Sequence, residues 1–90
     1  MTGESKRKLS EGLDRLRAEL KNLKADDETR QRLEDLARRV ERQLQQEGGA
    51  EEHHSLVQEL EDEILRFEVA HPRLTAIIND IMVALSQMGI

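Results

Sequence analysis

Histidines beside acidic residues are the most obvious candidates for chemistry in this 90-residue sequence. His53 and His54 directly follow Glu51 and Glu52, and imidazole and carboxylate groups are side chains that bind zinc. Adjacent residues on a helix point about 100° apart, whereas a zinc site needs three or four ligands that converge. No third ligand stands at a suitable spacing nearby, so we expect no metal here and a solvated loop and helix start instead.

His71 precedes Pro72, the single proline of the chain, and offers a second place for chemistry. Proline is tolerated in the first turn of a helix, so we expect His71 to cap a helix or to be partly buried. A pH-sensitive contact is the alternative, because histidine titrates near neutrality. The sequence supplies no second catalytic side chain beside His71.

Neighbouring carboxylates occur in strongly polar segments at Asp26-Asp27, Glu51-Glu52 and Glu61-Asp62-Glu63. A carboxylate that acts as a general acid or base needs an apolar or crowded setting that shifts its pKa. The sequence also contains no Gly-x-Ser-x-Gly motif, phosphate-binding glycine loop or dinucleotide fingerprint. We therefore expect no catalytic residues, no cofactor and no enzymatic activity.

The composition points to a single small domain with a large wet surface. Charged and hydrophobic residues each make up 37% of the chain, Phe67 is the only aromatic residue, and cysteine is absent. The absence of cysteine excludes disulfides and a thiol nucleophile. No apolar run is long enough to span a membrane, and no apolar stretch follows the basic residues near the start. The expectation is a cytoplasmic protein.

Leucine spacing predicts two helices in the first half of the chain. From Leu9 to Leu23 the leucines recur at steps of 4, 3, 4 and 3, which is typical of a coiled-coil seam and predicts a helix over 5–24. A second block starts ten residues later at Leu33, where an unbroken heptad pattern needs seven or eleven. Asp26 or Asp27 is a good N-cap between the blocks, so we expect a second helix over 27–46.

Glycine and proline mark the predicted helix boundaries in the second half of the chain. Gly48-Gly49 predicts a turn over 47–52 and an antiparallel return of the chain. Further apolar blocks predict helices over 53–70, with Val57, Leu60, Ile64 and Phe67 as the seam, and over 72–88. Heptad spacing continues through Pro72, so two long kinked helices are the alternative. The expected fold is all-α: one domain over 1–90, a helical hairpin or bundle with coiled-coil character, with residues 1–4 disordered.

Charge is distributed unevenly. Residues 1–46 carry 12 basic and 10 acidic side chains (net +2), whereas residues 47–90 carry 2 basic and 9 acidic side chains (net −7). An acid repeatedly precedes a base by four residues, as in Glu4–Lys8 and Glu28–Arg32, which supports solvated helix faces. The overall charge of −5 argues against general attraction to nucleic acid.

Three arginines near the end of the second helix stand out. An antiparallel hairpin about Gly49 would place Arg38, Arg39 and Arg42 near Glu59, Glu61 and Asp62, and this structural role is the main expectation. A basic patch for an acidic protein is the first alternative. Nucleic-acid binding through the three arginines is the second, although acids interleave with them and no aromatic residue is nearby to stack on a base.

The segment 74–88 is apolar over most of its helical circumference, so it must be widely buried. Because the other predicted seams are narrow, we expect it to pack against another copy of the chain. The predicted self-association surface consists of Phe67, Leu74, Ile77, Ile78, Ile81, Met82, Leu85 and Met88. Burial within a monomeric bundle, a membrane surface and a different protein are the alternatives. Ile78→Asp or Ile81→Asp is expected to abolish assembly, whereas Glu61→Ala is expected to change little.

The C-terminal half carries a resemblance to a known family. The stretch 66–78, which contains Phe67-Glu68 and His71-Pro72-Arg73-Leu74, together with 84–90, resembles short bacterial proteins catalogued as domain of unknown function 4404. Segments 16–20 and 27–30 are similar too, although sequences rich in Leu, Glu and Arg are common in helical proteins. The resemblance implies a small bacterial cytoplasmic protein with no assigned activity, and it supplies no catalytic residues.

Taken together, the sequence predicts a structural or interaction module that forms a homo-oligomer, without metal, cofactor, nucleic acid or a membrane span. An adaptor or regulator that binds an amphipathic helix of another protein in a groove is the alternative function.

Overall fold

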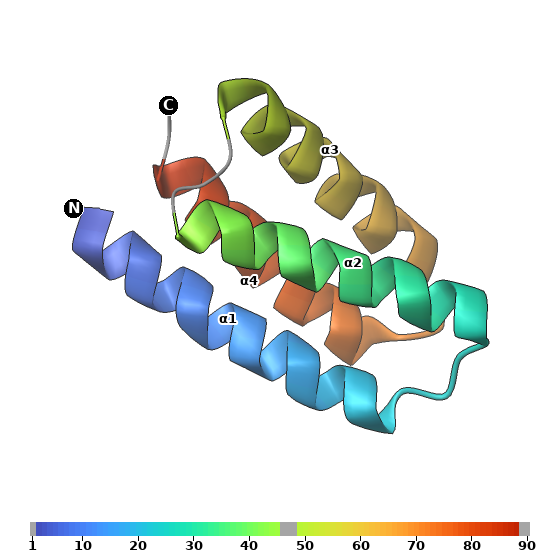
Figure 1. Cartoon of the computed structure of the whole chain (residues 1–90). Helices are drawn as coiled ribbons and strands as arrows, with labels where there is room; N and C mark the ends of the chain where they lie inside the picture. The colour runs from blue at the N-terminus through green and yellow to red at the C-terminus, as the bar shows by residue number, and fades with distance from the viewer. Residues whose placement is uncertain (1, 46–48, 89–90) are drawn as a thin grey trace.

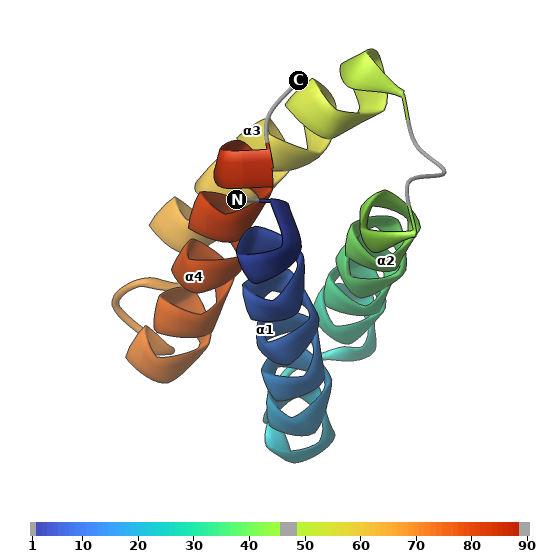
Figure 2. The ribbon, with the colours of Figure 1, turned by 90° about the vertical axis from the view of Figure 1, so that its left-hand side faces the viewer.

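Four antiparallel α-helices form a bundle in a computed structural model, which describes residues 2–45 and 49–88 (Figure 1). The helices are α1 (Thr2–Asn22), α2 (Asp27–Leu44), α3 (Ala50–Phe67) and α4 (Pro72–Met88). Helix α1 packs against both α2 and α4, and α4 also packs against α3. Figure 2 shows α1 standing between α4 and α2. The contact between α2 and α3 is the sparsest of the four helix pairs.

The all-α bundle of four helices is confirmed, and the alternative of two long kinked helices is wrong. The predicted bounds of the fourth helix, 72–88, match those of α4. Helix α1 begins at Thr2, so residues 2–4 are helical rather than disordered, while residue 1 lies outside the described residues. The coiled-coil character of the bundle stays a prediction.

The turn predicted over 47–52 ends earlier than expected, before residue 50. Gly49 is the N-cap of α3, so residues 50–52 already belong to the helix. Residues 46–48, which include Gly48, lie outside the described residues. At its other end, α3 stops at Phe67 instead of residue 70.

Polar contacts fix the two described connections between helices. The Asp26 side chain accepts a hydrogen bond of 2.8 Å from the backbone N–H of Thr29, which makes Asp26 the N-cap of α2. Between α3 and α4, the backbone N–H of His71 donates to the Phe67 carbonyl at 2.7 Å. Pro72 then starts α4, where its missing N–H costs no helical hydrogen bond.

A single apolar core runs through the bundle and receives side chains from every helix. In α1 and α2 the buried leucines follow the predicted blocks. In α3 the innermost apolar residues are Leu56, Leu60 and Phe67, whereas Val57 and Ile64 of the predicted seam are only partly buried. Helix α3 is therefore rotated relative to its predicted orientation.

Helices α1 and α4 approach closely at one glycine. A Cβ atom added to Gly12 would lie 2.8 Å from Cγ1 of Ile81, which is fully buried. This is closer than real Cβ contacts, so only glycine lets the two backbones pack at this distance.

Candidate functional site

The predicted self-association surface lies in the core of the single chain. Phe67, Leu74, Ile77, Ile78, Ile81 and Leu85 are buried, and Met82 and Met88 are partly buried against the same core. The expectation that three narrow seams leave these side chains uncovered is wrong, because α1 and α3 enclose α4 from two sides. Ile78→Asp would put a carboxylate into this core, so it would test folding rather than association.

The two most exposed large apolar side chains described by the structure lie on the outer face of α3 and in the turn that follows it. Leu65 is 66% exposed, and Val69, in the turn after α3, is 91% exposed. Three exposed carboxylates surround them in the sequence, and none forms an ion pair with another described residue. We call this set the acidic strip: Glu61, Asp62, Leu65, Glu68 and Val69.

A shallow groove of about 450 Å³ lies between α1 and α2. Buried Leu20 and Ala37 are its apolar members, and four of its five charged residues are cations. We call it the basic groove, and its lining consists of Arg17, Leu20, Lys21, Arg30, Glu34, Ala37 and Arg38.

Two arginines of the basic groove are engaged within the chain. The Arg30 guanidinium donates to the carbonyls of Leu20 and Leu23, so it satisfies backbone acceptors at the C-terminal end of α1. Arg17 Nη2 lies 2.8 Å from Glu41 Oε1. These contacts hold two positive charges in place across the junction of α1 and α2.

The other two cations of the basic groove are more accessible. Lys21 is exposed and forms no ion pair with another described residue. Arg38 contacts Asp35 on its own helix at 3.3 Å, and both side chains are more than half exposed. An exposed pair of this kind contributes little to stability, so Arg38 can exchange Asp35 for an outside carboxylate.

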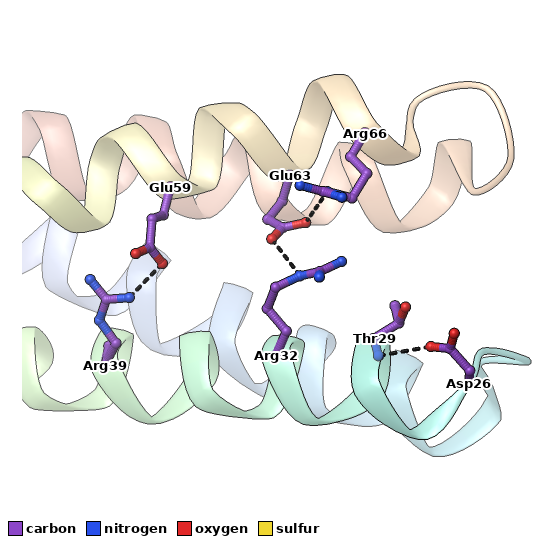
Figure 3. A network of polar contacts seen from close by, with 7 residues as sticks. All are labelled: Asp26, Thr29, Arg32, Arg39, Glu59, Glu63 and Arg66. Carbon is purple, nitrogen blue, oxygen red and sulfur yellow. Dashed lines mark hydrogen bonds and ion pairs between the residues drawn. The ribbon is translucent and has the colours of Figure 1, made fainter.

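Ion pairs cross the seam between α2 and α3, and Figure 3 shows those of Arg32 and Arg39. The Glu63 carboxylate is 5% exposed and lies between Arg32, with Nε 3.0 Å from Oε2, and Arg66, with Nε 3.4 Å from Oε1. Opposite charges on both sides offset part of the cost of removing this carboxylate from water, while Arg32 Nε and Glu63 Oε1 are buried without a hydrogen bond. Sequence reasoning missed Glu63, because acids in a polar run carry no signal of burial.

The predicted arginine partners are correct in one case. Arg39 pairs with Glu59 across the seam, as expected. Arg42 instead lies 3.4 Å from Glu52, and Arg38 stays on its own helix. Glu61 and Asp62 are exposed on the far side of α3. The three arginines therefore do not share one set of partners.

Two of the three histidines, His53 and His71, take part in side-chain contacts. His53 Nδ1 lies 3.4 Å from Oε1 of the buried Gln43, and the His71 ring meets the Phe67 ring edge-on at a centroid distance of 5.8 Å. His71 immediately precedes α4 and is partly exposed. Within residues 2–45 and 49–88, no three His, Asp or Glu side chains are grouped to hold a metal ion.

Asp26 is the carboxyl group with a clear electrostatic perturbation. The hydrogen bonds from the side chain and the backbone of Thr29 lower the pKa of Asp26 below its ordinary value of 3.8, and the charge of Arg32 acts in the same direction. Because Asp26 is an N-cap, this shift reflects helix capping rather than catalysis.

Comparison with known proteins decides the family. A family model described as domain of unknown function (DUF4404) matches residues 9–90. The chain belongs to the DUF4404 family. No curated protein and no solved structure matches it. The family description assigns no activity, so a function has to be inferred from the surfaces of this DUF4404 chain.

The DUF4404 match spans all of α2, α3 and α4 and most of α1. The acidic strip and the basic groove therefore both fall inside the matched region. In the described part of this DUF4404 chain, none of the helices has the length and apolar character that crossing a membrane requires.

Proposed function

We propose that this DUF4404 chain is a protein–protein interaction module that self-associates through the acidic strip of α3. The observation that carries the proposal is the exposure of Leu65 and Val69, four residues apart and 66% and 91% exposed. Apolar side chains that protrude from a charged surface gain free energy when a partner removes them from water.

The arrangement of the core supports association through exposed side chains rather than through the apolar side chains of α4. The core is closed by the chain's own helices, and the predicted surface on α4 takes part in it. Association must therefore use side chains that remain outside, and the acidic strip supplies apolar contact area framed by charge. Such a layout matches the anatomy of interfaces, with an apolar centre and a polar rim.

Sedimentation velocity on the full chain tests the proposal. We expect the average mass of the wild-type protein to rise with concentration, in a series that reaches about 1 mM to detect weak binding. A Leu65→Ser/Val69→Ser variant should stay monomeric at every concentration with an unchanged helical circular dichroism spectrum, because both side chains lie outside the core.

Val83→Ser is the matched control, since Val83 is an exposed valine on α4, away from the acidic strip. It should associate like the wild-type protein. A wild-type protein that stays monomeric throughout the series, or an equal loss of association in the control, would rule out the proposal.

A further inference from the structure

We infer that the acidic strip of one copy docks into the basic groove of a second copy, so that the chains assemble head to tail. This inference rests on the proposed function, which names the strip but leaves the receiving surface open. The basic groove fits because its chemistry is the complement of the strip in both its charged and its apolar parts.

Charge is the first part of the complementarity. The strip carries three carboxylates, Glu61, Asp62 and Glu68, and the one exposed cation beside them, Arg66, is paired with Glu63. The groove carries four cations and one carboxylate. Lys21 and Arg38 are the groove cations that an incoming carboxylate can reach, whereas Arg17 and Arg30 add fixed positive charge behind them. Opposite potentials of this kind steer two surfaces together and set their register.

Apolar contact is the second part. Leu65 and Val69 protrude from the strip, and the groove contains the apolar side chains of Leu20 and Ala37 among its lining residues. Leu20 and Ala37 are only 4% and 2% exposed, so docking would place Leu65 and Val69 over the floor of the groove and against the aliphatic stems of its cations. Because one helix face meets one groove, the interface is small and belongs to the weak, transient class.

The positions of the two surfaces determine the form of the assembly. The groove is bounded by α1 and α2, whereas the strip faces away from the bundle on α3. One copy can therefore offer its strip to one neighbour and its groove to another. Such a heterologous contact produces rings or open chains rather than a closed dimer.

Two complementary variants test this arrangement. The first, Leu65→Ser/Val69→Ser, disables the strip and keeps the groove. The second, Lys21→Glu/Arg38→Glu, disables the groove and keeps the strip. We expect each variant alone to be monomeric in sedimentation velocity. An equimolar mixture should form a 1:1 dimer that grows no further, because it holds only one intact strip and one intact groove that can meet.

The matched control for the groove variant is Arg7→Glu/Arg73→Glu, which changes the net charge equally on two exposed arginines outside the groove. It should associate like the wild-type protein. Wild-type association should also weaken when salt is raised from about 0.1 M to about 1 M, because the Debye length falls from about 10 Å to about 3 Å.

The outcomes separate this inference from the proposed function. If the groove variant alone associates like the wild-type protein while the strip variant is monomeric, strips pair with strips and the head-to-tail inference is wrong. If the strip variant alone still associates, the proposed function fails instead. A mixture that stays monomeric although both variants are folded would also overturn the inference.

Discussion

Nε of Arg32 lies 3.0 Å from Oε2 of Glu63, across the seam between α2 and α3. The carboxylate occupies an inward position of α3, between Leu60 and Phe67, where its neighbours in the core are apolar. Arg66 approaches its second oxygen from the same helix. A charged residue thus joins the two helices whose mutual contact is the sparsest in the bundle.

Removal of the Glu63 carboxylate should destabilise the protein. We expect Glu63→Ala to lower the free energy of unfolding by about 1–3 kcal/mol, because it leaves the partly exposed Arg32 without its counter-charge and removes the contact that joins α2 to α3. Urea denaturation followed by circular dichroism measures the loss. Glu61→Ala removes an exposed carboxylate of the same helix and should change stability by less than about 0.5 kcal/mol. Equal losses for the two variants would show that the buried pair does not join the helices.

The contact of Gly12 with Ile81 predicts an unusual glycine substitution. Alanine usually stabilises a helix relative to glycine by up to about 1 kcal/mol. At position 12 the added Cβ would overlap Cγ1 of a buried isoleucine, and overpacking costs about 1–3 kcal/mol. We therefore expect Gly12→Ala to lower the urea midpoint.

The matched control for this substitution is Gly3→Ala in the same helix. A Cβ atom at Gly3 meets nothing within 4 Å, so this variant should be at least as stable as the wild-type protein. In a Gly12→Ala/Ile81→Ala double variant, the two losses should be less than additive, since the second substitution removes the overlapping atom. Strict additivity would argue against a direct contact.

Arg30 is expected to stabilise the C-terminal end of α1 through the geometry of its guanidinium. It reaches two carbonyls, those of Leu20 and Leu23, whereas lysine offers a single charged nitrogen. Arg30→Lys should lower stability by about 1 kcal/mol and speed amide hydrogen exchange in the last turn of α1. Arg38→Lys, at an exposed pair, should leave exchange in that turn unchanged. Unchanged exchange in both variants would contradict the capping role.

The lowered pKa of Asp26 predicts that part of the protein's stability is lost at acid pH. Its pKa is lowered in the folded state by the hydrogen bonds from Thr29, so its stabilising effect is complete above its ordinary pKa of 3.8. That effect is lost as the pH falls through the lower, folded-state value. Asp26→Asn keeps a side chain that can cap the helix but does not titrate.

The measurement is urea denaturation of both proteins between about pH 5 and about pH 1. The advantage of the wild-type protein over Asp26→Asn should shrink as the pH falls below 3.8. A difference that stays constant over this range would show that the capping interaction does not depend on the charge of Asp26.

A spacing of four residues between an acid and a base predicts some ion pairs of this protein and not others. The expected pair Glu4–Lys8 forms at 3.6 Å. The same spacing predicted Glu28 as the partner of Arg32, yet Arg32 pairs with Glu63 from another helix. A long arginine side chain takes the partner that the packing of helices brings near, and the sequence spacing alone does not describe that packing.

The sequence by itself determined the four helices and the starts of α2 and α4, because those depend on neighbours within a few residues. Asp26 capped α2 and Pro72 started α4 as their local chemistry dictates. Only the tertiary structure decided which faces are covered. It enclosed α4 within the chain, rotated α3 so that Glu63 turned inward, and left Leu65 outside. Burial is a property of the neighbours that a helix acquires in space, and residues far apart in the sequence supply those neighbours.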